Sequence, residues 1–196
     1  GSTFSQIKQY NGKDNTADVY QHNAGGVESF VEQLNGDDNT AKVTQKISIG
    51  DAYSMVKQVG SDNYASVFQG EKSRRLESFV NQQGDDNKAT VNQNSSFTAH
   101  NDPDPVKTVS DIYQKGTYNT AKVLQEDVSS TVSDIDQYSK DNNAVVKQYV
   151  GAELESMIMQ KGIGNGANVD QTGHNHSSTV TQMGNGNTAN VTQADL

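Results

Sequence analysis

Apolar and amide side chains recur along this chain at a spacing of two residues, in pairs of short segments joined by a polar turn. The clearest copy runs from Ser78 to Gln93 and reads SFVNQQGDDNKATVNQ. Its first arm is Ser-x-(Ile/Val)-x-Gln, and its second arm is Asn-x-Ala-x-Val-x-Gln. A spacing of two places such residues on one face of a β-strand. The pattern therefore predicts a strand, a tight turn rich in Gly, Asp and Asn, and a second strand.

This unit occurs eight times with no exception to its skeleton. The copies span residues 5–21, 29–45, 54–69, 78–93, 110–125, 133–148, 156–171 and 178–193. Repeats of this length are typical of solenoids and related arrays. We therefore predict an all-β fold, a single β-solenoid over residues 1–196 with eight stacked strand-turn-strand rungs. At ~4.8 Å per rung the stack would be ~38 Å tall.

One insertion breaks the regular spacing of the units. Unit starts are 22 to 25 residues apart, except for a step of 32 between the fourth and fifth units, where residues 94–107 are added. The insertion contains Pro103 and Pro105, and proline cannot donate a hydrogen bond to a strand ladder. We predict a surface loop at 94–107, and a hinge between two halves of the stack is the alternative.

Composition alone would indicate disorder, and the repeat changes that interpretation. Only 32% of the residues are hydrophobic, tryptophan is absent, and the mean hydropathy is -0.80. Such a chain buries too little apolar area to offset its ordering entropy unless the apolar residues fall in register. A single unit would bury one Ile or Val, one Ala and one Val, so stability must come from stacking.

The amide residues share the inward side of the strands with the apolar residues. A buried amide without a partner costs about 1–3 kcal/mol, and an identical amide on the next rung supplies the partner. We therefore predict ladders of stacked amides, with solvated surface amides as the alternative. The interior ladder residues would be Gln33, Asn39, Gln45, Gln58, Asn63, Gln69, Gln82, Asn87, Gln93, Gln114, Asn119, Gln125, Gln137, Asn142, Gln148, Gln160, Asn165 and Gln171.

Several function classes find no support in the residues. The net charge is -9 with scattered basic residues, so we expect no nucleic-acid binding. No apolar run approaches the roughly 20 residues that span a bilayer, so we expect no membrane insertion. The chain has no cysteine. No catalytic constellation is visible, and we expect neither an enzyme nor a cofactor.

Two features invite a metal-site hypothesis. His174 and His176 are two residues apart, and the pairs Asp37-Asp38 and Asp85-Asp86 are similar to calcium-binding turns. The histidines lack a third ligand nearby in sequence, and the aspartates lack the repeat of calcium solenoids. We expect polar turns rather than a metal site, and the sequence leaves metal binding open.

The units resemble the curlin repeat, from which curli, the bacterial amyloid fibres of the biofilm matrix, are built. That repeat reads Ser, five residues, then Gln-x-Gly-x-x-Asn-x-Ala-x-x-x-Gln. The matching residues in three of the units are Gln82, Gly84, Asn87, Ala89 and Gln93; Gln114, Gly116, Asn119, Ala121 and Gln125; and Gln182, Gly184, Asn187, Ala189 and Gln193. Here Ser stands four residues before the first Gln, and the units outnumber those of the best-known curli subunits.

The resemblance implies a function outside the cell. It implies export through dedicated secretion machinery, although no signal peptide is visible in this chain, and growth from a nucleator subunit into extracellular fibres for adhesion and biofilm cohesion. The main fibre subunit and the minor nucleator both remain open. A monomeric solenoid that acts as an adhesin or ice-binding module is a further alternative, which would need capped ends.

The ends of the repeat array suggest how copies would join. The first unit begins at Ser5 and the last ends at Gln193, which leaves little chain for a cap. We therefore expect head-to-tail self-assembly into an open filament. The polymerisation interface would consist of Gln9, Asn15 and Gln21 at one end and Gln182, Asn187 and Gln193 at the other. The outward rows vary and carry charges, which we expect to discourage lateral sticking.

Overall fold

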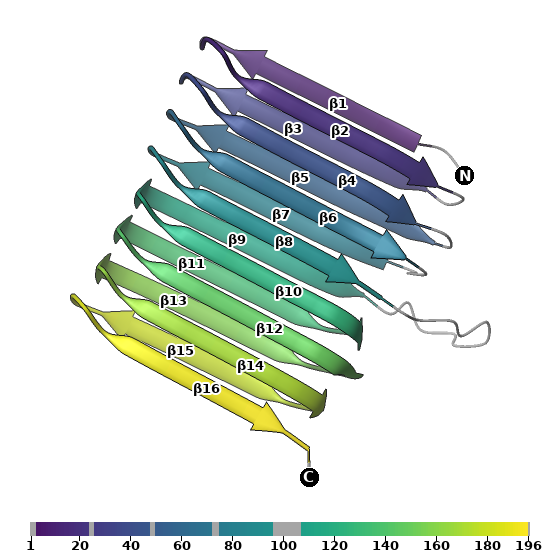
Figure 1. Ribbon diagram of the computed structural model, residues 1–196, viewed down its shortest axis with the longest axis vertical. Coiled ribbons are helices and arrows are strands. Elements are labelled where there is room, and N and C mark those ends of the chain that lie inside the picture. The colour runs from purple at the N-terminus through teal and green to yellow at the C-terminus, as the bar shows by residue number, and fades with distance from the viewer. Residues whose placement is uncertain (1–2, 24–25, 48–49, 72–74, 96–106, 196) are drawn as a thin grey trace.

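A computed structural model describes residues 3–23, 26–47, 50–71, 75–95 and 107–195 of the chain. These residues form two parallel sheets of eight strands each, stacked face to face (Figure 1). The odd-numbered sheet contains β1 (Thr3–Tyr10), β3 (Val27–Leu34), β5 (Asp51–Val59), β7 (Arg75–Gln83), β9 (Thr108–Thr117), β11 (Val132–Lys140), β13 (Glu155–Ile163) and β15 (Ser177–Met183). The even-numbered sheet contains β2 (Thr16–Asn23), β4 (Thr40–Ile47), β6 (Tyr64–Glu71), β8 (Lys88–Asn94), β10 (Thr120–Ser129), β12 (Asn143–Ala152), β14 (Gly166–His174) and β16 (Thr188–Ala194).

Each odd strand, its turn and the following even strand form one rung, so rung 1 is β1–β2 and rung 8 is β15–β16. Equivalent residues of neighbouring rungs pair directly: Ile7 with Val31 in the odd-numbered sheet, and Val19 with Val43 in the even-numbered sheet. The predicted all-β solenoid is therefore confirmed. The strand spacing of two that defined each unit places the same residue types on the inner faces of both sheets.

The core is a continuous column between the two sheets. The odd strands contribute Ile or Val, such as Val80, and the even strands contribute Ala and Val, such as Ala89 and Val91, all fully or almost fully buried. A second small cluster, which includes Ile47 and Leu76, fills the side where one rung leads into the next. Because each rung adds few apolar side chains, its neighbours above and below must cover them.

The turns explain why glycine recurs beside the amide rows. Gly84 has a φ of 111°, a conformation that side-chain-bearing residues rarely adopt. A Cβ added there would collide with the backbone carbonyl oxygen of Gly116 on the next rung. The sixth turn has Ser139 at this place, with a φ of 85°. Close stacking of the turns therefore restricts this corner to very small residues.

The stack continues across the long insertion. Residues 96–106 of the predicted 94–107 loop lie outside the described residues, whereas β8 ends at Asn94 and β9 begins at Thr108. On both sides of the insertion the register is kept, with Ser78 paired to Ser110 and Ala89 paired to Ala121. Both sheets thus run without interruption from rung 4 to rung 5.

The terminal rungs differ from the interior ones. Ile7 in β1 is 45% exposed, whereas its partner Val31 is 1% exposed. Along β16 the residues that are buried in other rungs are only partly buried. Within the described part of the chain, β1 pairs only with β3, and β16 pairs only with β14. The inward rows therefore come to the surface at both ends of the stack.

Candidate functional site: amide ladders and terminal rungs

The first glutamine of each rung forms an unbroken ladder inside the stack. From Gln9 to Gln160, each side-chain Nε2 donates to the Oε1 of the equivalent glutamine on the next rung, at 2.7 to 2.9 Å. The interior members are fully buried. In order, the ladder consists of Gln9, Gln33, Gln58, Gln82, Gln114, Gln137, Gln160 and Gln182.

The second glutamine of each rung forms a parallel ladder in the other sheet. Its Nε2-to-Oε1 distances are 2.8 to 3.0 Å, and all donors point toward the following rung. In order, the ladder consists of Gln21, Gln45, Gln69, Gln93, Gln125, Gln148, Gln171 and Gln193. Every rung is thus tied to the next by one such bond in each sheet.

Asparagine forms a third ladder, which runs in the opposite direction. Each Nδ2 donates to the Oδ1 of the preceding rung at 2.9 to 3.1 Å. The same Oδ1 accepts the next asparagine's backbone N–H at 2.9 to 3.2 Å. In order, the ladder consists of Asn15, Asn39, Asn63, Asn87, Asn119, Asn142, Asn165 and Asn187.

The glutamines also connect the two sheets. Nε2 of Gln33 donates to the backbone carbonyls of Thr16 and Asn39, at 2.9 and 3.0 Å. Nε2 of Gln45 in the other sheet donates to the carbonyl of Glu28 at 3.1 Å. A carbonyl can only accept, so these contacts fix which side-chain atom is nitrogen. The direction of each ladder follows from the backbone around it.

The ladder directions give the two ends of the stack opposite hydrogen-bonding character. At rung 1, Gln9 and Gln21 accept no side-chain bond on Oε1 from any described residue, and the backbone N–H of Asn15 has no described acceptor. At rung 8, Gln182 and Gln193 have no further Oε1 to donate to, and the Asn187 Oδ1 receives no donor in the described chain. Among the described residues, the rung 1 end thus presents free glutamine acceptors and asparagine donors. The rung 8 end of the described chain presents free glutamine donors and a free asparagine acceptor.

The serine row differs from the amide rows in what it contributes. The serines of rungs 2 to 8, such as Ser29 and Ser78, are buried, yet within the described structure their hydroxyls have no hydrogen-bond partner. The adjacent backbone carbonyl, for example that of Glu28, receives the glutamine of the facing strand. The small serine side chain leaves room for the glutamine to reach this carbonyl, so we attribute the role of serine to its size. Sequence reasoning had no signal to separate this role from hydrogen bonding.

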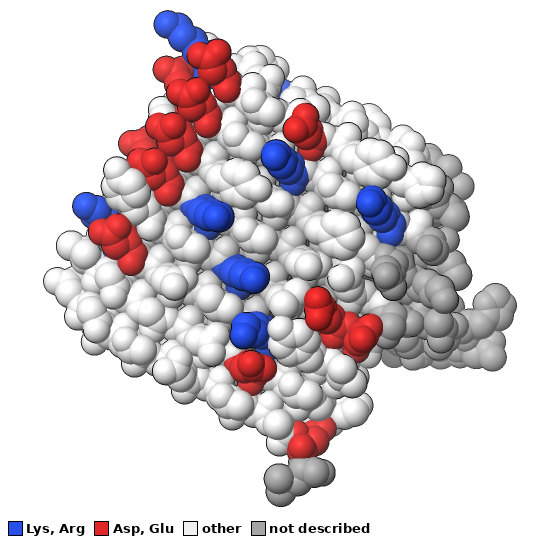
Figure 2. All heavy atoms as spheres, in the orientation of Figure 1, with Lys and Arg blue, Asp and Glu red and all other residues white. Residues whose placement is uncertain are grey.

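Carboxylates collect along the edge where the turns stack. Figure 2 shows acidic side chains in a row along this edge. The stacked turns of rungs 1 to 4 contain the exposed residues Asp14, Asp38, Asp62 and Asp86, each with a φ of 53° to 56°. The side chain of Asp37 accepts the Lys13 backbone N–H at 2.7 Å, so part of this chemistry closes the turns.

The histidine pair lies beside a carboxylate that sequence analysis did not connect with it. His174 Nδ1 lies 3.2 Å from Oδ2 of Asp195, and His176 Nε2 lies 3.2 Å from Oδ1 of the same carboxylate. Hydrogen bonds from the His174 backbone and ring hold the pKa of Asp195 below its usual range. The rung pairing could have revealed this contact, because the pairing of Gln171 with Gln193 places Asp195 beside Gly173. Among the described residues, no group of three or more His, Asp and Glu side chains is arranged to hold a metal ion.

The sheets and ladders together define a class of protein. Two stacked parallel sheets tied by Gln and Asn ladders form a cross-β solenoid. A family model described as Curlin associated repeat matches residues 12–46 and 164–194. The chain is a curli-like repeat protein, and its ladders indicate a curli-like amyloid subunit.

The matched segments lie at the two ends of the stack. They include Asn15 and Gln21 of rung 1 and Gln182, Asn187 and Gln193 of rung 8. The search of curated proteins found no match to this chain. The matched repeat is a structural one, with no catalytic family indicated. The described residues include no helix of the length and apolar character that would cross a membrane.

Proposed function

We propose that this chain is a structural subunit of an extracellular curli-like fibre, to which copies add head to tail, for biofilm cohesion and adhesion. A nucleator subunit would start the fibre, and dedicated secretion machinery would export the chain. The supporting observation is the complementarity of the terminal rungs. Rung 8 offers amide donors where rung 1 offers amide acceptors, and the asparagine row offers the reverse.

A copy stacked on rung 8 in the register of the interior rungs extends all three ladders. Gln182 Nε2 would donate to Gln9 Oε1, and Gln193 Nε2 would donate to Gln21 Oε1 of the incoming copy. The Asn187 Oδ1 would receive the Asn15 amide groups. An inverted copy would place donors against donors, or acceptors against acceptors, so the ladders favour one direction of assembly.

The same contact covers the apolar residues exposed at the ends. Ile7 and Val19 of one copy would lie over Val180 and Val191 of the other. Each buried hydrogen bond contributes about 1 kcal/mol, and each apolar side chain that is fully covered contributes about 2 kcal/mol. The contact joins the rung 8 end of one copy to the rung 1 end of the next, so it repeats without closing and produces a filament.

Two end-blocked variants test this assembly. The C-face variant carries Gln182→Leu, Asn187→Lys and Gln193→Lys, and the N-face variant carries Gln9→Leu, Asn15→Lys and Gln21→Lys. Each variant alone should remain monomeric in sedimentation experiments, because one partner surface is blocked. An equimolar mixture should form dimers and stop there, since each variant retains one intact and complementary end.

A matched control separates end blocking from general damage. The control carries Thr181→Leu, Asn190→Lys and Thr192→Lys on β15 and β16, where these side chains point outward. It introduces the same residues, one Leu and two Lys, on the same rung and should elongate from seeds as the parent does. C-face variants that elongate equally fast, or a mixture without dimers, would show that the terminal rungs are not the growth surface. A parent that stays monomeric with seeds for days would instead favour a binding module.

A further inference from the structure

The outer faces of the two sheets carry charges that the proposed fibre contact does not use. We call the outward side chains of the odd-numbered strands the A face and those of the even-numbered strands the B face. The even-numbered strands lie in front in Figure 1, and Figure 2 shows basic side chains spread over the B face. The A face instead contains a group of unpaired carboxylates.

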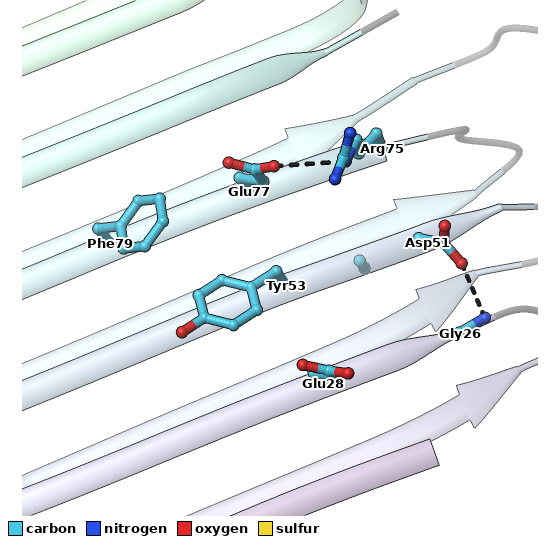
Figure 3. A pocket seen from close by; sticks show the side chains of 8 residues that line it. Gly26, Glu28, Asp51, Tyr53, Arg75, Glu77 and Phe79 are labelled. Carbon is cyan, nitrogen blue, oxygen red and sulfur yellow. Dashed lines mark hydrogen bonds and ion pairs between the residues drawn. The ribbon is translucent and has the colours of Figure 1, made fainter. Parts of the chain in front are cut away.

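These carboxylates are Asp111 on β9 and Asp134 and Asp136 on β11. None of the three forms an ion pair or hydrogen bond with a described residue, in contrast to Glu77, which lies 3.4 Å from Arg75 in the hollow of Figure 3. Partial burial, and then the negative charges of Asp136 and Asp111, raise the pKa of Asp134 to about 6. The group is therefore electrostatically unfavourable in an isolated molecule.

Two lysines on the B face lie on the same two rungs. Lys122 is on β10 and Lys147 is on β12, and neither forms an ion pair within the described chain. Within one molecule the two groups point away from each other across sheets ~10 Å apart. Each group faces water and salt on its own side of the molecule, where charges are screened beyond a Debye length of about 8 Å at physiological ionic strength. Attraction through the core therefore does not explain the arrangement.

The chain reversal within each rung determines which residues would meet in a side-by-side contact. The bond from Gln45 to the Glu28 carbonyl shows that the end of an even strand faces the start of an odd strand. A second copy displaced sideways, without rotation, would therefore set the two faces in opposite residue order. The pairs brought together by this displacement would be Lys8 with Asp18, Glu32 with Lys42, Asp134 with Lys147, and Met55 with Phe68.

We propose that parallel solenoids associate side by side, with the A face of one copy on the B face of a second copy. The charge pairs have opposite signs on rungs 1, 2 and 6, and the apolar pair lies on rung 3. Lys8 and Glu32 already lie 3.6 Å apart within one copy, so the pair of Asp134 with Lys147 is the one that carries the proposal. A hollow of about 340 Å³ lined by Met55, Phe79, Asp134 and other residues can receive the Lys147 stem of the neighbour. Contacts between two A faces would place carboxylates against carboxylates, so unlike faces are selected.

This lateral contact is separate from the end-to-end contact of the proposed function. It uses outward side chains only, and each face is free when the other is occupied, so it generates an open row of solenoids. Filaments would repeat the contact along their length, which strengthens a weak single contact through avidity. The proposal departs from the expectation that outward charge discourages lateral association, because charges of opposite sign would meet in this contact.

Cross-linking tests the geometry directly, because the chain contains no cysteine. Filaments grown from a mixture of Met55→Cys and Phe68→Cys copies should form disulfide-linked dimers on oxidation. A mixture of Met159→Cys and Phe68→Cys is the matched control, since these positions are four rungs apart, ~19 Å, and should not link. Linking in the control, or efficient linking of Met55→Cys with itself, would overturn the proposed pairing.

Charge reversal tests the cause of the association. Asp134→Lys alone and Lys147→Asp alone should each reduce bundles to single filaments in electron micrographs, and the double variant should restore bundles. Raising the salt from about 0.05 to about 0.5 M should disperse parent bundles. Seeded elongation should be equal in all variants, so loss of bundling is distinguishable from loss of axial growth. Bundling that is unchanged in both single variants, or absent in the double variant, would refute the proposal.

Discussion

Replacing one interior ladder glutamine should weaken the fold far more than replacing the serine four residues before it. Gln82 Nε2 donates to the carbonyls of Tyr64 and Asn87, each at 3.0 Å, and to Gln114 Oε1 at 2.9 Å. Its own Oε1 accepts from Gln58 at 2.9 Å. The two Nε2 hydrogens are shared among these three acceptors. Gln82→Leu would therefore remove two donated hydrogen bonds and one accepted one, which contribute about 1 kcal/mol each.

The leucine side chain would return part of this loss. Its burial contributes about 1–2 kcal/mol, so we expect a net decrease of about 1–2 kcal/mol in the free energy of unfolding. Ser78→Ala is the matched control on the same strand, β7. The Ser78 hydroxyl is buried and unpartnered in the described structure, so its removal should cost nothing or stabilise by up to about 1 kcal/mol.

Denaturant unfolding followed by far-UV circular dichroism measures both values. Both substitutions are made in the C-face variant, because polymerisation of the folded protein would otherwise raise its apparent stability. Sedimentation of the same samples checks that they are monomeric. Equal destabilisation by Gln82→Leu and Ser78→Ala would refute the reasoning, because it would mean that position on the strand, and not the amide ladder, determines the stability of a rung.

Three further changes follow from particular contacts and conformations. Asp134→Asn should stabilise the monomer above about pH 6 and leave it unchanged below about pH 4. The folded state raises the Asp134 pKa from 3.8 to about 6, so it binds more protons than the unfolded state and stability falls as the pH rises through that range. Because this carboxyl is half exposed, solvent screening limits the gain to about 1 kcal/mol, measured as unfolding midpoints across pH. Gly84→Ala should destabilise by about 3 kcal/mol or more, since a Cβ meets the Gly116 carbonyl. Gly164→Ala, at a φ of 68° with open space around it, should cost only about 1 kcal/mol in the same assay.

The sequence predicted the solenoid because its inner rows are periodic and nearly invariant among the units. Gln82 and Gln114 occupy equivalent places in their units, so pairing them required only the parallel register that the structure contains. Ile7 belongs to the same inward row as Val31, yet it is 45% exposed because β1 pairs on one side only within the described chain. Periodicity identifies which side a residue faces, but not what covers it.

Other features depend on three-dimensional relations that the repeat does not encode. The direction of each ladder depends on which carbonyls surround the amide, as Gln33 shows with Thr16 and Asn39. The match between Asp134 and Lys147 depends on the outward rows, which vary and carry no periodic signal. The structure is needed to show that Asp134 and Lys147 lie at equivalent positions on opposite faces of one rung, because the chain reversal within the rung determines which outward residues correspond.

The one-way glutamine ladders have a consequence for how a fibre would begin. Hydrogen bonds in a continuous series polarise one another, so each member of a long series is stronger than an isolated bond. The first two copies to meet join ladders of only eight amides each. A later copy adds to a longer and more polarised series. We therefore expect early contacts to dissociate more readily than later ones, which gives assembly a lag phase that originates in the interior of the solenoid.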